Sequence, residues 1–123
     1  MKVSKRAYAA LAKSVKHWER LNNCSTSEEL LQEGVRSTNC ELCKIYAIDK
    51  LTYNKCKYCP IKKHTGQEQC HETPYYNVID VFTRDLDVYP VTLAVDMNFR
   101  LIKLCVEKEL EFLKDLLSIC EIK

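Results

Sequence analysis

The chain has 123 residues and a formal net charge of +2, and it contains eight cysteines but only two glycines and three prolines. This length suits a single domain that buries a core of its own. So few glycines and prolines disfavour a β-sandwich with many turns, and they favour long helices joined by one irregular segment.

Positive charge is unevenly placed along the chain. Residues 2–20 carry six lysines and arginines against Glu19 alone, and residues 44–63 carry six lysines against Asp49 alone. From Asp80 onward the acidic residues outnumber the basic ones. The two basic segments are therefore a candidate contact surface for an acidic partner.

The N-terminal part is expected to form two helices. Between Ser4 and Asn22 apolar residues recur at helical spacing, and most of the lysines occupy the opposite face. Trp18 lies on the apolar stripe, so we assign it to core packing. Ser27 is a candidate N-cap for a short second helix that Gly34 ends.

Cysteines dominate the middle of the chain. Their pattern is Cys40-x2-Cys43-x12-Cys56-x2-Cys59, followed by Cys70-His71. Each Cys-x-x-Cys turn directs two sulfurs at one point, so two such turns can enclose a zinc ion in a tetrahedron of thiolates. Residues 36–73 show no clean periodicity of their own, and we predict that they form a structural zinc lobe with the first four cysteines as ligands.

Other ligand sets stay open. Cys70 or His71 could replace one of the four cysteines, because both side chains are zinc donors. An iron–sulfur cluster would also accept four thiolates, but the ferredoxin-type runs space their cysteines more closely, so zinc is favoured. The remaining cysteines are expected to be small buried residues on or near helices, namely Cys24, Cys105 and Cys120. The lone His17 and His64 carry no motif and are expected on the surface or in packing.

The chemistry of these cysteines favours a non-enzymatic role. A closed site of four sulfurs leaves no position for water, which indicates structure and not catalysis. The run Cys56-Lys57-Tyr58-Cys59-Pro60 resembles the motif of thiol-disulfide oxidoreductases, but that motif belongs in a βαβ unit, which the pattern of apolar residues does not predict. The zinc-deaminase signature fails because the cysteine pair precedes His71-Glu72. A thiol-disulfide oxidoreductase therefore stays only an alternative to the non-enzymatic role.

The part of the chain after the cysteines is expected to be helical. Pro74 predicts the first turn of a short helix, with a strand as the alternative, and Pro90 sets the boundary before the last element. From about Thr92 to Cys120 apolar residues repeat at helical intervals. Their stripe covers nearly half of the helix surface, so this long helix is expected to pack on both the first helix and the metal lobe.

One acidic residue falls within this stripe. An unpaired Glu109 would be costly to bury, so we expect it at the rim of the stripe, paired with Arg100 or a lysine of the first helix.

The sequence predicts a cytoplasmic protein. The apolar stretch from Ala7 to Ala12 is broken by Lys13 and is too short for a signal peptide, and no later run is apolar enough to span a bilayer. In a reducing compartment, paired Cys-x-x-Cys turns bind metal more often than they form disulfides.

Around the second cysteine pair, cations alternate with aromatic residues. The candidate partner-binding residues are Lys55, Lys57, Tyr58, Lys62 and Lys63. This mixture suits phosphate contacts and base stacking, so nucleic acid is a candidate partner. The competing interpretation is that the lysines keep the lobe soluble while the tyrosines cover the metal, and the small net charge favours it. A protein partner is therefore favoured over nucleic acid.

The order of several short motifs is also informative. They are Trp18, Cys40-Glu41-Leu42-Cys43, Cys56-Lys57-Tyr58-Cys59-Pro60-Ile61, Thr65-Gly66, Cys70 and Thr73-Pro74-Tyr75, with Glu109 to Leu117 at the end. This order resembles a group of small uncharacterised phage and prophage proteins and covers most of the chain. The resemblance implies a metal lobe, gives Cys70 equal standing as a ligand, and brings no established activity. It also implies binding to a host or viral macromolecule, including as an inhibitor.

These patterns predict one mainly α domain over residues 1–123. Long N- and C-terminal helices are expected to pack together, capped by the irregular zinc-binding lobe. The three parts are N-terminal helices in 1–35, the metal lobe in 36–73 and C-terminal helices in 74–123. The expected role is binding without turnover, and the wide stripe on the last helix leaves a homodimer open.

Overall fold

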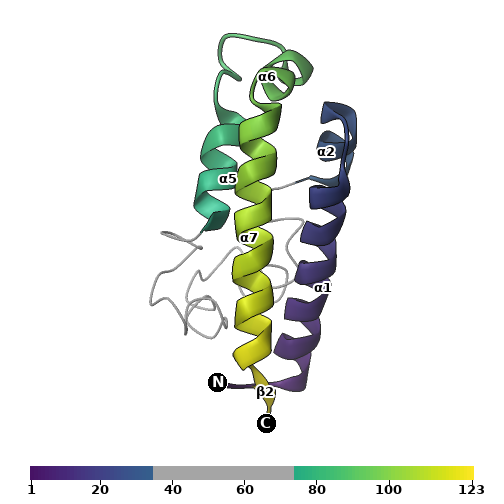
Figure 1. Cartoon of the computed structure of the whole chain (residues 1–123), viewed down its shortest axis with the longest axis vertical. Helices are drawn as coiled ribbons and strands as arrows, with labels where there is room; N and C mark the ends of the chain where they lie inside the picture. Colours follow the sequence, from purple (N-terminus) through teal and green to yellow (C-terminus); the bar gives the residue numbers. More distant parts are fainter. Residues whose placement is uncertain (35–73) are drawn as a thin grey trace, which may run out of the picture.

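The computed structural model describes residues 1–34 and 74–123. Its elements are β1 (Lys2–Val3), α1 (Lys5–Asn23), α2 (Ser27–Glu33), α5 (Pro74–Thr83), α6 (Val91–Met97), α7 (Phe99–Ile119) and β2 (Glu121–Ile122). The long helices α1 and α7 run side by side in opposite directions, and α5 packs beside α7 (Figure 1). The expected mainly helical fold is confirmed, whereas the predicted metal lobe lies outside the described residues.

The first helix forms where the periodicity placed it. The hydroxyl of Ser4 caps α1 by accepting a hydrogen bond from the backbone N–H of Ala7 at 3.1 Å. At the other end, the N–H of Cys24 bonds to the carbonyl of Leu21 and closes the last turn. Trp18 is 2 % exposed, so the assignment of this residue to core packing is confirmed.

The N-cap of the second helix lies one residue earlier in the chain than expected. Thr26, not Ser27, is the N-cap of α2, and its Oγ1 accepts a hydrogen bond from the N–H of Glu29 at 3.2 Å. Ser27 is the first helical residue, and its buried hydroxyl instead donates to the carboxylate of Asp96 in α6. Gly34 ends the helix with a φ of 79°, a conformation that glycine adopts without steric cost.

The C-terminal helix is interrupted, and the prediction of one continuous helix is wrong at this point. Asn98 separates α6 from α7, with φ −105° and ψ 11°. Its side-chain amide donates to the carbonyl of Ala94 at 3.1 Å and to the carboxylate of Asp85 at 3.3 Å. These bonds hold the backbone outside helical geometry, because asparagine competes with the helix for backbone partners. Pro90 is the N-cap of α6, as its predicted boundary role requires.

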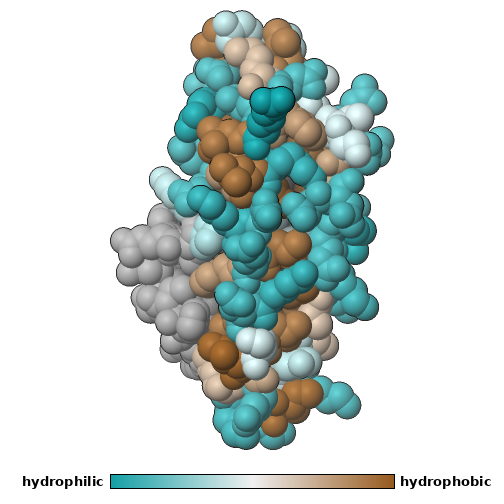
Figure 2. Space-filling view, viewed as in Figure 1, coloured by the Kyte–Doolittle hydropathy of each residue, from teal (hydrophilic) through white to brown (hydrophobic). Residues whose placement is uncertain are grey.

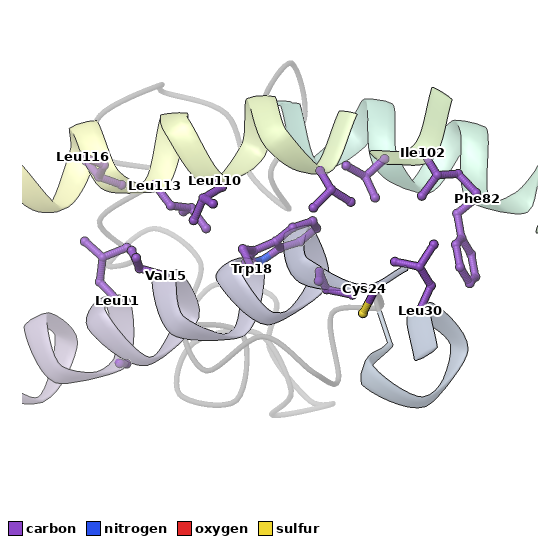
Figure 3. Close-up of a cluster of buried hydrophobic side chains, with 14 of the residues drawn as sticks. Leu11, Val15, Trp18, Cys24, Leu30, Phe82, Ile102, Leu110, Leu113 and Leu116 are labelled. Carbon is purple, nitrogen blue, oxygen red and sulfur yellow. The ribbon is translucent and has the colours of Figure 1, made fainter. Parts of the chain in front are cut away.

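The core lies between α7 and its two neighbours. Figure 3 shows Leu11 and Val15 of α1 on the side that faces Leu113 and Leu116 of α7, and all four are buried. The opposite flank of α7 packs on α5. This explains the wide apolar stripe, and it confirms the expected contact of the last helix with the first.

Glu109 lies inside this packed surface. The residue is 2 % exposed, so the prediction that places it at the rim of the stripe is wrong. The physical reason is helical spacing: Glu109 shares one face of α7 with Val106, Leu113 and Leu116, so it lies in the middle of the buried stripe and not at its rim.

The two ends of the chain pair with each other, which the sequence analysis did not anticipate. β1 and β2 are parallel, with Lys2 opposite Glu121 and Val3 opposite Ile122. The N-terminal ammonium donates to the carbonyl of Ile119 at 2.6 Å. Figure 1 shows both termini at the same end of the helical bundle. This pairing joins the start of α1 to the end of α7.

Candidate functional site

The predicted metal ligands and partner-binding lysines lie outside the described residues. This applies to Cys40, Cys43, Cys56 and Cys59, to the alternates Cys70 and His71, and to Lys55, Lys57, Tyr58, Lys62 and Lys63. Within residues 1–34 and 74–123, no group of three or more histidine, cysteine or acidic residues is placed to hold a metal ion. The zinc site therefore stays a prediction from cysteine spacing.

Both ends of the cysteine-rich segment are held at one place on α1. On the N-terminal side, the carbonyl of Gly34 lies 2.9 Å from Nε2 of His17. On the C-terminal side, the ring of Tyr75 meets the ring of Trp18 edge to face, with centroids 5.9 Å apart. His17 and Trp18 are neighbours in α1, so Gly34 and Tyr75, which lie on either side of residues 35–73 in the sequence, contact adjacent side chains. We call these four residues the junction.

The electrostatics of the junction centre on a buried histidine. His17 is 6 % exposed, and its Nδ1 lies 3.3 Å from a carboxylate oxygen of Glu33. Burial, with a smaller effect of the Arg20 charge, lowers the pKa of His17 against the Gly34 carbonyl and the Glu33 carboxylate, which raise it. Glu33 also accepts from Nε of Arg20 at 3.1 Å. The Gly34 carbonyl can only accept, so Nε2 is the donor in this contact, and Arg20 balances the charge of Glu33.

Sequence reasoning classed His17 with surface or packing residues, and the structure confirms the packing. It did not predict the contact with Gly34, because the two residues are far apart in sequence and share no motif. Only the fold of α2 back along α1 brings them together.

The three described cysteines are packing residues. Cys24 and Cys120 are buried, Cys105 is half-buried, and none of the three forms a disulfide in the part of the chain that the structure describes. Desolvation by burial raises the pKa of each thiol, which disfavours the reactive thiolate form. The Sγ of Cys24 donates to the carbonyl of Arg20 at 3.2 Å. The expectation of small buried residues is confirmed for Cys24 and Cys120.

A lysine of α7 holds the C-terminal end of α1. The ammonium of Lys103 donates to the carbonyls of Leu21 at 3.1 Å and Cys24 at 2.7 Å, and also to the carbonyl of Asn22. These acceptors lie at the C-terminal end of α1, where the helix dipole is negative. Lys103 therefore fixes the end of α1, a few residues after the junction, against α7.

The outer face of α1 carries a row of exposed cations. Its members are Lys5, Arg6, Lys13 and Lys16, which we call the basic face. Among the described residues, none of the four takes part in an ion pair. Lys5 and Arg6 lie in the first turn of α1, which holds no acidic residue. Cations at a helix N-terminus oppose the helix dipole, so these charges are locally unfavourable to the fold.

Comparison with known proteins adds no assignment. No family model, no curated protein and no solved structure matches the chain. The resemblance to phage cysteine-cluster proteins thus stays a prediction. None of the helices in residues 1–34 and 74–123 has the length and apolar character needed to cross a membrane.

Proposed function

We propose that the protein is a non-enzymatic binding module in which zinc orders residues 36–73 and the basic face contacts an acidic surface of a protein partner. The observation that carries the proposal is the basic face itself. Four exposed cations lie on one helix and form no ion pairs within the described residues, and two of them oppose the dipole of α1. Charges that are unfavourable within the fold are explained when a partner supplies the opposite charge.

The junction supports a coupling between the two parts of this module. His17 and Trp18 are buried in the helical frame, and they hold the residues on both sides of the cysteine-rich segment. A metal bound by Cys40, Cys43, Cys56 and Cys59 would supply folding free energy to that segment, on the order of 10 kcal/mol in small zinc units. The basic face and the lysines at 55–63 would then act as one contact surface.

The partner class follows from the resemblance to phage proteins. For a small phage protein without turnover, a protein of the bacterial host is the partner we propose, with inhibition of that protein as the outcome. Nucleic acid is the second candidate, because an exposed row of lysines and arginines also suits phosphate groups.

Metal content is the first test of this function. Protein purified anaerobically under reducing conditions is expected to contain one zinc per chain by elemental analysis. Replacement of Cys40 or Cys56 by serine should reduce that ratio, while the matched change Cys105→Ser should preserve it because Cys105 is a half-buried helix residue. A zinc-free protein that keeps its native circular dichroism would contradict the scaffold.

Partner capture tests the basic face. Wild-type protein and the double variant Lys13→Glu/Lys16→Glu are used as bait in host lysate, with Lys114→Glu on α7 as the matched exposed control. We expect the double variant to lose the captured protein and the control to retain it, more clearly at low salt. Prior nuclease treatment distinguishes a protein partner from nucleic acid. Equal capture by all three baits would reject the basic face.

A further inference from the structure

A second exposed surface, on α6 and the first half of α7, is apolar. Leu93 and Met97 of α6 and Leu101 and Leu104 of α7 are 46 %, 53 %, 39 % and 48 % exposed. Figure 2 shows hydrophobic residues in the upper part of the molecule, around α6 and the upper half of α7, interspersed with hydrophilic ones. We call these four residues the outer stripe. Four large apolar side chains exposed on neighbouring turns of a small domain are a candidate interaction site.

The outer stripe has the spacing of a helix-pairing surface. Leu93 and Met97 are four residues apart in α6, and after the break at Asn98 Leu101 and Leu104 are three residues apart and share one face of α7. Ile102 and Val106 are fully buried on the other face, against α1 and α5. The outer stripe is therefore separate from the core, and its face becomes charged beyond Leu104, where Lys108 and Glu111 are exposed.

The charges beside the stripe select the partner. Arg100 and Glu107 are both exposed, have opposite signs, and lie seven residues apart on the same flank of Leu101 and Leu104. In an antiparallel pair of identical helices with the two-fold axis between Leu101 and Leu104, each Leu101 faces the Leu104 of the other chain. Arg100 of each chain then lies beside Glu107 of the other, which gives two reciprocal ion pairs.

The parallel arrangement lacks this complementarity. It would place each Leu101 against its own copy and bring Arg100 near the uncharged Cys105, so the charges would have no partner. From the apolar spacing and the antiparallel charge match, we propose that the outer stripe is the interface of a homodimer in which two α7 helices pair antiparallel. This interface leaves the basic face of α1 unused, so the two proposals fail or succeed independently.

The oligomeric state in solution tests the proposal. Zinc-loaded protein under reducing conditions is measured by sedimentation equilibrium over a range of concentrations, so that disulfide linkage cannot contribute. The wild type is expected to dimerise. The variant Leu101→Glu should raise the dissociation constant of the dimer at least about a hundredfold, because each of the two chains then buries a carboxylate in the interface. The control Ile122→Glu makes a similar change at an exposed residue near the chain ends and should leave the dimer intact.

A charge-exchange experiment tests the orientation. Arg100→Glu and Glu107→Arg should each weaken dimerisation about tenfold, since each places like charges together twice. The double variant Arg100→Glu/Glu107→Arg restores both pairs and should recover the wild-type dissociation constant. A monomeric wild type at high concentration overturns the proposal, and so does a double variant at least as weak as the single ones.

Discussion

The lysine that joins α7 to the end of α1 gives the sharpest test of the fold. Replacing Lys103 by methionine keeps the length of its aliphatic stem but removes the ammonium that donates to the carbonyls of Leu21, Asn22 and Cys24. An ammonium has three N–H donors, and all three have acceptors here. The carbonyls at this helix terminus would lose their cation, so we expect the variant to be destabilised.

The magnitude follows from two opposing effects. A hydrogen bond to a charged group contributes about 1.5–3 kcal/mol, but three bonds from one ammonium do not add in full. Desolvation by burial lowers the pKa of Lys103, against smaller effects of Cys24 and Glu29 that raise it, so burying this charge has a cost that its removal recovers. We therefore expect Lys103→Met to lower the free energy of unfolding by about 2 kcal/mol.

Urea denaturation followed by circular dichroism measures this change. Zinc and protein concentrations are kept equal between samples, because metal binding and association both shift apparent stability. Lys114→Met is the control, since Lys114 is an exposed lysine of the same helix without a carbonyl partner among the described residues, and it should stay within about 0.5 kcal/mol of the wild type. Equal stability of the two variants would refute the assigned role of Lys103.

Three further outcomes are expected. Burial lowers the pKa of His17 below that of the unfolded chain, so the unfolded state binds more protons and stability falls as the pH drops below about 6.5. The variant His17→Gln should remove this part of the pH dependence, which is measured as the difference in melting temperature between pH 7.5 and pH 5. Leu11→Ala should cost about 3 kcal/mol in urea denaturation, because Leu11 is fully buried, while Ile119→Ala should change little. Cys24 and Cys120 should react slowly with a thiol reagent in native protein and quickly after unfolding, since burial raises the pKa of both; rapid native labelling would contradict their packing role.

Local patterns predicted most of the helices. Ser4, Gly34, Pro74 and Pro90 each act through their own backbone or an adjacent turn, and the structure has each at or beside the predicted helix boundary. Asn98 was missed because its side chain bonds to Asp85 as well as to Ala94, and the contact with Asp85 depends on how the preceding connector folds. Propensity alone does not reveal such a competitor to the helix.

The candidate functional residues also divide into those that a local pattern predicts and those that depend on contacts between distant parts of the chain. The zinc site is a prediction from spacing alone, because ligand geometry is encoded within each Cys-x-x-Cys turn, and its proposed ligands are outside the residues that the structure describes. The junction was not predicted. His17 carries no motif, and its roles appear only when α2 folds back along α1 and α5 brings Tyr75 to Trp18.

The amino-acid sequence by itself determined the mainly helical class, the apolar faces of α1 and α7 and the concentration of cations on α1, since each depends on periodicity along one segment. The tertiary structure alone decided that Glu109 is enclosed, that Lys103 meets the end of α1, and that β1 pairs with β2. The physical reason is that these contacts join residues far apart in the chain, and their energies depend on distances that no local pattern specifies.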